Sequence, residues 1–440
     1  MNLNDKTLLE LQEFAKEQGI KGFSKYKKAE LISLIEANLP KKEENIIPQE
    51  DADDMIIDEE NIVETVAEKK EETQEVCGIM DVLGDGYGFL RGENYLSTSK
   101  DVYVSPTQIK RFNLKTGDKV LGLTRETRGE EKNKPLIFVK TVNNEPPFKA
   151  VRRRPFEYLV PVYPNERIYL ENNDDKAMRL IDLVAPLGKG QRGLIVAPPK
   201  AGKTTLLKKI ANAVNKNAPD VELIVLLIDE RPEEVSDMKR SVKGDVIYST
   251  FDEQPEHHIR VAEMVFERAH RLAEQRQDVI ILLDSLTRLT RAYNLVIPSS
   301  GRTLSGGIDP AAFYGPKKFF GAARNIENGG SITILATALT ETGSRMDEVI
   351  FEEFKGTGNM EIHLDRELQE KRIFPAVDIN KSGTRKEELL MTENELNAMW
   401  KIRRSLSKKS TVEVCEKLVN MIDKTSSNKE LTDALAKGHE

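Results

Sequence analysis

The chain has 440 residues, of which 39% are apolar and 32% charged, a composition typical of a folded protein with more than one domain core. No apolar run approaches the roughly 18 residues of a membrane-spanning helix, and the first residues lack the basic and apolar regions of a secretory signal. The two cysteines, Cys77 and Cys415, exclude a disulfide scaffold and a cysteine-rich zinc site. We therefore expect a cytoplasmic protein with no membrane partner.

The net charge of −7 is distributed unevenly along the chain. Residues 41–75 contain 14 acidic and 4 basic side chains, a net charge of −10, so the rest of the chain carries +3. This acidic segment is poor in aromatic residues and has no sustained period, which predicts a flexible linker. The mildly basic remainder leaves a nucleic-acid partner open.

Residues 1–40 predict a small helical module made of two short helices. Thr7 and Glu10 have the spacing of a capping box, and Gly19 is placed to end the first helix. The second helix is apolar on several positions and ends at Pro40. Lysines at the turn between the helices could bind phosphates or could form an ordinary solvated face.

Residues 76–145 change to a pattern of short strands separated by turn residues. We expect five strands, at residues 76–83, 87–91, 101–105, 119–126 and 136–142. Five short strands in so few residues predict a small barrel of the OB-fold, similar to a cold-shock domain.

The second of these strands carries a candidate surface for nucleic acid. Tyr87, Phe89 and Arg91 share one face because side chains alternate along a strand. Two aromatic rings and an arginine on a small barrel can stack on the bases of a single strand, and Tyr103 on a later strand could extend the surface. Ordinary barrel packing is the alternative interpretation of the aromatic pair.

The second half of the chain predicts a parallel α/β domain over residues 176–425. Residues 146–175 are rich in proline and predict a connector, and residues 426–440 predict a C-terminal tail. Apolar strands are expected at 193–197, 221–229, 278–284 and 331–339, and the first three lead into helical patterns.

The segment from Ala197 to Thr204 matches the phosphate-binding pattern G-x-x-x-x-G-K-[ST], except that Ala197 replaces the first glycine. An expected strand precedes it and an expected helix follows. Gly202 lets the backbone approach the phosphates, and the helix N-terminus attracts their charge. Lys203 would reach the β- and γ-phosphates of ATP, and the Thr204 hydroxyl would bind Mg²⁺.

Two carboxylates lie at the ends of expected strands. Asp284 ends the strand 278–284 and would hold Mg²⁺ through water. Glu230 follows the strand 221–229 and would orient and polarise the attacking water. Capping of the following helix is the alternative role of each acid.

Hydrolysis also needs cations for the charge that develops on the γ-phosphate, and Arg385 and Arg366 are the candidates. Arg385 also has an alternative interpretation without a catalytic role. Thr384 and Glu387 have capping-box spacing, which would make Arg385 an ordinary residue of a first helical turn.

Two glycine-containing loops, Pro298–Pro310 and Thr340–Asp347, are expected after sheet elements, at the edge where the loops of parallel sheets carry function. Arg302 in the first loop and Arg345 in the second could each bind an RNA backbone. Solvated surface loops are the alternative.

Together these features resemble the bacterial transcription termination factor Rho family. The resemblance rests on the aromatic barrel and on the segments 197–204, 227–234, 283–288 and 382–388, and it covers roughly residues 1–40 and 76–425. It implies a homohexameric ring whose RecA-type ATPase domain uses ATP and Mg²⁺. Such a protein depends on single-stranded RNA, translocates 5′→3′ and releases RNA from transcribing RNA polymerase, with elongation-factor proteins as further partners.

The resemblance also implies roles for individual residues. The primary RNA site would comprise Gly86, Tyr87, Gly88, Phe89, Leu90, Arg91, Asp101, Val102 and Tyr103. The two central-channel RNA loops would comprise Arg302, Thr303, Leu304, Ser305, Gly306, Gly307 and, in the second loop, Arg345. The nucleotide pocket would comprise Gly188, Lys189, Gly190, Gln191, Arg192, Gly193, Lys200, Ala201, Gly202, Lys203, Thr204, Thr205, Arg231 and Phe374, with the Phe374 ring against adenine. Arg385 would be an arginine finger that reaches the ATP of a neighbouring subunit, and Arg366 a second cation near that interface.

The chain departs from the family's pattern at several points. Arg302 and Arg345 stand where well-known members have lysine, which keeps the charge and changes the geometry toward phosphate. Residues 131–135 offer no aromatic third wall for the primary site. Two other classes stay open: a rotary-type or protein-translocating hexameric ATPase with the same nucleotide core, and a passive RNA-binding protein with an inactive nucleotide site.

Overall fold

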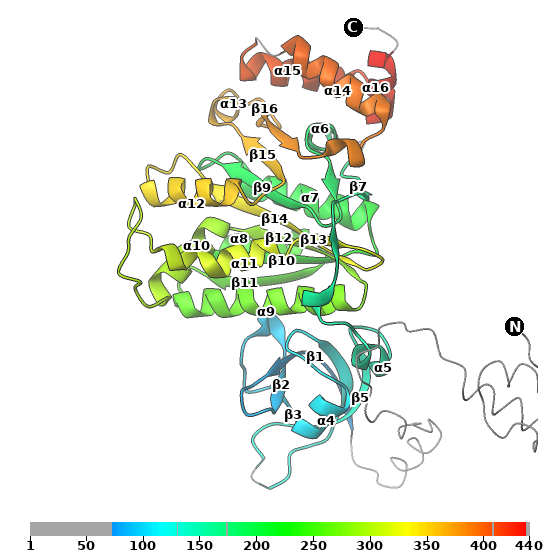
Figure 1. Ribbon diagram of the computed structural model, residues 1–440, viewed down its shortest axis with the longest axis vertical. Coiled ribbons are helices and arrows are strands. Elements are labelled where there is room, and N and C mark those ends of the chain that lie inside the picture. Colours follow the sequence, from blue (N-terminus) through cyan, green and yellow to red (C-terminus); the bar gives the residue numbers. More distant parts are fainter. Residues whose placement is uncertain (1–72, 130, 173–174, 407–408, 437–440) are drawn as a thin grey trace, which may run out of the picture. The chain divides into compact units, whose positions relative to one another are not determined.

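A computed structural model describes residues 73–129, 131–172, 175–406 and 409–436 (Figure 1). The expected helical module 1–40 and nearly all of the acidic segment 41–75 lie outside the described residues. In the part of the chain that is described, no helix has both the length and the apolar character needed to cross a bilayer.

The first described domain is a five-stranded barrel. Its strands are β1 (Gln74–Val82), β2 (Gly88–Arg91), β3 (Val102–Val104), β4 (Lys119–Thr124) and β5 (Leu136–Val142). They pair antiparallel in the order β3-β2-β1-β4-β5, and a bridge between Tyr103 and Pro135 joins the two ends. The five expected strands are confirmed, but β1 begins at Gln74, inside the segment expected to be linker.

A nine-stranded sheet organises the second domain. The four expected strands are present as β9 (Arg192–Ala197), β10 (Glu222–Glu230), β12 (Asp278–Asp284) and β14 (Ser331–Leu339). The sequence missed β11 (Asp245–Thr250), β15 (Met360–Leu364) and β16 (Val377–Thr384). The main order is β11-β10-β12-β14-β9-β15-β16, parallel except for β16. The short strands β6 (Pro161–Val162) and β13 (Arg324–Ile326) extend it at β14, and β7 (Arg167–Ile168) pairs separately with β8 (Leu187–Gly188).

Helices cover both faces of this sheet because its central strands are apolar on both faces (Figure 1). In β9, Leu194 and Val196 pack with α9 (Pro255–Glu274), α10 (Leu286–Val296), α11 (Tyr314–Gly321) and α12 (Arg345–Lys355). Ile195 and Ala197 pack on the other face with α6 (Lys176–Val184), α7 (Lys203–Asn217) and α8 (Pro232–Ser241). Alternate residues of one strand therefore belong to two separate cores.

The C-terminal segment is more structured than the sequence suggested. After α13 (Arg366–Glu370), α14 (Glu393–Leu406) and α15 (Thr411–Asp423), the expected tail forms the helix α16 (Asn428–Ala436). Leu431 is buried in the core, and the Arg179 guanidinium donates to the Asn428 side chain at 3.2 Å. The interpretation of 426–440 as a tail is therefore wrong up to Ala436. The connector likewise contains α5 (Pro147–Val151) and a short 3-10 turn, Phe156–Tyr158.

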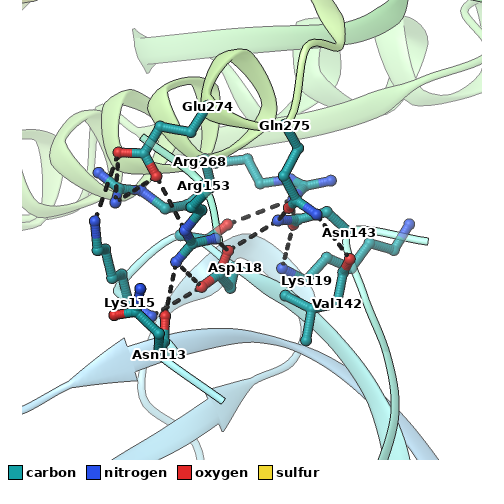
Figure 2. Close-up of polar contacts among 12 residues, drawn as sticks. Asn113, Lys115, Asp118, Lys119, Val142, Asn143, Arg153, Arg268, Glu274 and Gln275 are labelled. Carbon is teal, nitrogen blue, oxygen red and sulfur yellow. Dashed lines mark hydrogen bonds and ion pairs between the residues drawn. The ribbon is translucent and has the colours of Figure 1, made fainter. Parts of the chain in front are cut away.

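A buried polar network joins the barrel to helix α9 (Figure 2). Arg153 of the connector lies 2.6 Å from the Asp118 carboxylate of the barrel and 3.1 Å from the Glu274 carboxylate of α9, and all three side chains are buried. Asn143 of the barrel donates to Asp118 at 2.8 Å and accepts from Arg268 of α9. Arg153 thus forms ion pairs with one carboxylate of the barrel and one of α9, and these contacts hold the barrel against the helix.

Candidate nucleotide and RNA sites

The phosphate-binding loop lies between β9 and α7, as expected. Gly202 has a φ of +90° at the N-cap of α7, a conformation that favours glycine, and Lys203 is the first residue of the helix. Ala197 is the last residue of β9, a regular strand position. The alanine that replaces the first motif glycine therefore stands in a strand conformation that does not require glycine.

Lys203 lies between the two expected catalytic acids. Its Nζ is 2.6 Å from Glu230 Oε1 and 2.6 Å from Asp284 Oδ2, and both carboxylates are buried. Burial alone lowers the pKa of Lys203, but the charges of Asp284 and Glu230 outweigh it and raise the pKa. Burial and the Asp284 charge raise the pKa of Glu230, against the pull of Lys203. The structure thus brings Lys203, Glu230 and Asp284 together from three elements.

Three further residues, which the sequence did not identify, complete this cluster. The Thr337 hydroxyl on β14 donates to Asp284 Oδ1 at 2.6 Å, and the Thr204 hydroxyl donates to Glu234 on α8 at 3.1 Å. Arg288 on α10 lies 3.3 Å from Glu230 Oε1. Arg288 and Glu234 stand inside the motif segments, but Thr337 lies 53 residues after Asp284 and only the fold brings the two together.

The donor set fits a hard cation. The Thr204 hydroxyl and the oxygens of Asp284, Glu230 and Glu234 are ligands that Mg²⁺ prefers. Among the described residues, no group of three or more His, Cys, Asp or Glu side chains forms a metal cage. Mg²⁺ typically needs only one or two protein ligands when substrate phosphates supply the others, and Thr204 and Asp284 are the candidates.

The expected nucleotide residues separate onto two opposite edges of the sheet. Residues 200–205, Glu230 and Arg231 lie at the carboxyl edge of the parallel strands, where β9 and β10 end. Residues 188–193 lie where β9 begins, and there Lys189 forms ion pairs with Glu166 and Asp278. Within one chain, the length of β9 separates residues 188–193 from the phosphate loop.

Arg385 belongs to the amino edge with residues 188–193. Thr384 pairs with Met360, which in turn pairs with Gly193, and the Arg385 amide donates to Asn359 O at 2.8 Å. The capping-box alternative is wrong, because Thr384 ends β16 and its hydroxyl donates to Pro186 O at 2.7 Å. Arg385 is exposed at the end of the strand.

Arg366 and Phe374 lie at the other edge, beyond the carboxyl end of β15. Arg366 starts α13 and binds Glu370 at 2.8 Å on the surface. Phe374 is 53% exposed, as an aromatic side chain that covers a ligand must be before the ligand binds. Both residues share the edge of the phosphate loop, so a role of Arg366 in the same chain is compatible with the fold.

On the barrel, three aromatic rings form one half-exposed cluster, named the platform here: Tyr87, Phe89 and Tyr103. Their ring centroids are 5.9 to 6.0 Å apart in each pair. Phe89 and Tyr103 face each other on the adjacent strands β2 and β3. The extension of the aromatic surface by Tyr103 is thus present in the structure.

The other expected residues of the primary site support the platform from behind. Arg91 is buried, lies 2.7 Å from Asp81 and 2.5 Å from Asp101, and its guanidinium carbon is 5.1 Å from the Phe89 ring centroid. The side chains of Leu90 and Val102 belong to the barrel core, so only their backbone can reach a ligand. The sequence did not identify Asp81, whose role depends on a contact within the folded barrel.

The two glycine-containing loops touch each other. Gly306, with a φ of +83°, packs against the backbone of Arg345 and Met346 so closely that a side chain would not fit. Arg302 and Arg345 are both exposed. The loop 340–347 follows β14 as expected, but the loop 298–310 follows helix α10 and not a sheet element, which corrects that expectation.

Asp347 fixes the second loop. It binds Arg291 of α10 at 2.6 Å and accepts from the Thr342 hydroxyl at 2.6 Å. Two exposed arginines on adjoining loops, anchored to α10 and α12, form a surface suited to a phosphate backbone.

Three family models match the chain. The ATP synthase alpha/beta family nucleotide-binding domain matches residues 177–384, the Rho termination factor RNA-binding domain matches 76–147, and the Rho termination factor N-terminal domain matches 2–44. The solved structure of a prototypical ATPase from a type III secretion system aligns over 64% of this chain and 87% of its own, with a TM-score of 0.54 and 24% identity. An ATP synthase subunit from Nanoarchaeum equitans aligns over 64% and 81%, with a TM-score of 0.51 and 18% identity. These structures share the fold of the ATPase domain.

Curated relatives cover nearly the whole chain. The transcription termination factor Rho of Bacillus subtilis is 52% identical over 99% of this chain and 95% of its own length. That of Aquifex aeolicus is 52% identical over 98% and 94%, and that of Pseudomonas aeruginosa is 56% identical over 81% and 87%. The chain belongs to the transcription termination factor Rho family.

Proposed function

We propose that the chain is an RNA-dependent ATPase that terminates transcription. It would bind nascent single-stranded RNA on the barrel, translocate 5′→3′ by ATP hydrolysis in the cytoplasm, and release RNA from RNA polymerase, with elongation-factor proteins as further partners. The observation that carries this proposal is the combination, in one Rho-family chain, of the Lys203–Glu230–Asp284 cluster with the aromatic platform.

The contacts of Lys203 suggest how ATP would start the reaction. An incoming γ-phosphate competes with Glu230 and Asp284 for the lysine, because a phosphate offers it charged oxygens as well. Glu230, with its raised pKa, then accepts a proton from the attacking water. Thr204 and Asp284 would hold Mg²⁺, which supplies neutralisation of phosphate charge when it is bound.

A second copy of the chain would complete the site. Arg385 lies at the edge of the sheet opposite to the phosphate loop, so it serves ATP best when it is supplied by a neighbouring subunit. A closed ring of identical chains repeats this contact at every interface, and a homohexamer is the arrangement we propose. The residues 188–193 would then approach the neighbour's nucleotide together with Arg385.

The adjoining loops around Arg302 and Arg345 would grip RNA in the ring and move with the nucleotide state. The second loop follows β14, which also carries Thr337, the partner of Asp284. A movement of Asp284 could therefore be transmitted through Thr337 and β14 to the second loop.

A rotary-type or protein-translocating hexameric ATPase is the alternative, and the likeness of the fold to a secretion-system ATPase is the observation in its favour. Such a motor has no use for a cluster of three aromatic rings on an upstream barrel.

Steady-state ATP hydrolysis tests the proposal. Wild type and a Tyr87→Ala/Phe89→Ala double variant would be measured with no polymer, with single-stranded RNA, and with DNA of the same base sequence. We expect RNA to stimulate wild type strongly and the double variant to need more RNA for the same rate. A rate that ignores RNA would contradict the proposal and favour a protein substrate.

A further inference from the structure

A cavity of about 600 Å³ lies outside every site described above. Its walls are the 115–116 turn of the barrel, helices α9 and α10, and the segment that contains α11. The volume falls within the roughly 300–1,000 Å³ range of small-molecule sites, so a nucleotide fits.

A chain of ion pairs connects the cavity to the residues behind the platform. Arg260 of α9 lines it, and its guanidinium lies 2.6 Å from Asp81 Oδ1. The other oxygen of Asp81 binds Arg91, which lies against Phe89 of the platform. The Asp81 carboxylate therefore lies between Arg91, behind the platform, and Arg260, which lines the cavity.

The same cavity also borders the loop 298–310. Ile297 and Ala311, the residues that flank this loop, both line the cavity. An RNA strand that runs from the platform to the loop around Arg302 could pass through this cavity.

The cavity is lined by the kinds of side chain that bind single-stranded nucleic acid. Four cations, Lys115, Arg260, Arg271 and Lys318, and two carboxylates, Glu263 and Glu267, line the cavity, and Lys115 lies 3.8 Å from Glu274 behind it. Arg271 already binds Glu267 at 3.1 Å, whereas Lys318 is exposed and lies above the Phe266 ring at 5.4 Å. The exposed Glu263 is an acceptor suited to the amino group of cytosine.

Two tyrosines supply surfaces for stacking. Tyr314 is 77% exposed at the rim. The ring of Tyr293 packs on Gly315, where any side chain would collide with it. The Tyr293 hydroxyl, like that of any tyrosine at neutral pH, carries its proton and can donate to RNA.

We propose that this cavity is an additional RNA-binding site that holds one or two nucleotides of single-stranded RNA between the platform and the loop 298–310. The inference rests on the proposed function, because it requires an RNA that occupies both ends. Tyr314 would stack on a base, and Lys318 and Arg260 would bind the adjoining phosphates.

Photo-crosslinking of the full chain to single-stranded RNA with 4-thiouridine, mapped by mass spectrometry, tests the proposal. We expect crosslinks at the platform and also at Tyr293 or Tyr314. Tyr314→Ala should weaken RNA binding about fivefold, as loss of one stacked base does. Lys318→Ala should reduce the magnitude of the salt slope by about 0.7, as loss of one phosphate contact with a single strand does.

Tyr158→Ala is the matched control, because Tyr158 is 66% exposed and does not line the cavity. It should bind RNA as wild type does. Crosslinks at the platform without crosslinks in the cavity, together with wild-type affinity of Tyr314→Ala, would overturn the RNA-binding site and leave the proposed function standing. Absence of RNA binding at the platform as well would instead contradict the proposed function.

Discussion

The two edges of the central sheet carry different groups of candidate nucleotide residues. At the carboxyl edge, Lys203, Glu230 and Asp284 are buried and bind one another. At the amino edge, Arg385 is exposed beside residues 188–193. The first edge is assembled within one chain, whereas we propose that Arg385 at the second edge reaches a nucleotide across a contact between chains.

Removal of Arg385 should have the largest effect. Arg385→Ala is expected to lower kcat by about 10³-fold or more, because an arginine finger acts on charge that develops in the transition state. Nucleotide affinity should change little. Steady-state hydrolysis with saturating RNA and nucleotide titration would measure both quantities.

Lys381→Ala is the control for Arg385, because Lys381 is an exposed cation on the same strand that binds Asp378 at 3.2 Å. Its kcat should stay near that of wild type. Lost affinity with unchanged kcat in Arg385→Ala would place Arg385 in substrate binding and contradict its role as a finger.

Glu230→Gln should affect the carboxyl edge alone. Loss of a general base typically lowers a rate by about 10² to 10⁴-fold, and Asp284 still holds Lys203 in this variant. Single-turnover hydrolysis and ATP binding would be measured in parallel. If the single-turnover rate stays at the wild-type value, Glu230 is not the base.

Thr337→Val should have a smaller effect, because it removes only the hydroxyl that orients Asp284. Loss of such a supporting contact lowers metal affinity or activity by about 10 to 100-fold, so the Mg²⁺ concentration for half-maximal nucleotide binding should rise. Thr290→Val is the matched control, since the buried Thr290 hydroxyl donates only to Leu286 O of its own helix. Equal Mg²⁺ dependence of the two variants would separate Thr337 from the metal site.

The pH dependence of the wild type should show the smallest effect. Glu230 acts as a base only when it is ionised, and its pKa is raised, so activity should fall as the pH drops through a value above the usual glutamate pKa of about 4.3. The acid limb of kcat/KM with saturating RNA measures that value. An acid limb at or below the usual glutamate pKa would contradict the environment described for Glu230.

The fold could be predicted where sequence patterns are local. The strands β10 and β12 are apolar runs bounded by polar residues, and the phosphate loop follows β9 directly. The strands β11 and β16 were missed because they lie at the ends of the sheet order, where fewer of their residues are buried. The strand β16 also exposes Asn380 and Lys381 and contains Gly383, which weakens its pattern further.

The site could be predicted only in part. Lys203, Glu230 and Asp284 follow from local motifs, because Lys203 begins the helix after the phosphate loop and the two acids each end a strand. The separation of residues 188–193 from the phosphate loop was not predicted, because a motif does not show on which edge of the sheet its residues lie. Asp81 and Thr337 act through partners that are distant in sequence or on another element, so no local pattern marks them.

Complementation between two inactive variants tests the central claim most directly. Glu230→Gln and Arg385→Ala chains would be produced separately, mixed under conditions that allow subunit exchange, and measured for RNA-stimulated hydrolysis. If ATP lies between chains, an interface with Glu230 from one chain and Arg385 from the other is intact, so the mixture should hydrolyse ATP although neither variant does so alone. A mixture that stays as inactive as its components, with exchange verified by labelled chains, would contradict a site shared between two chains.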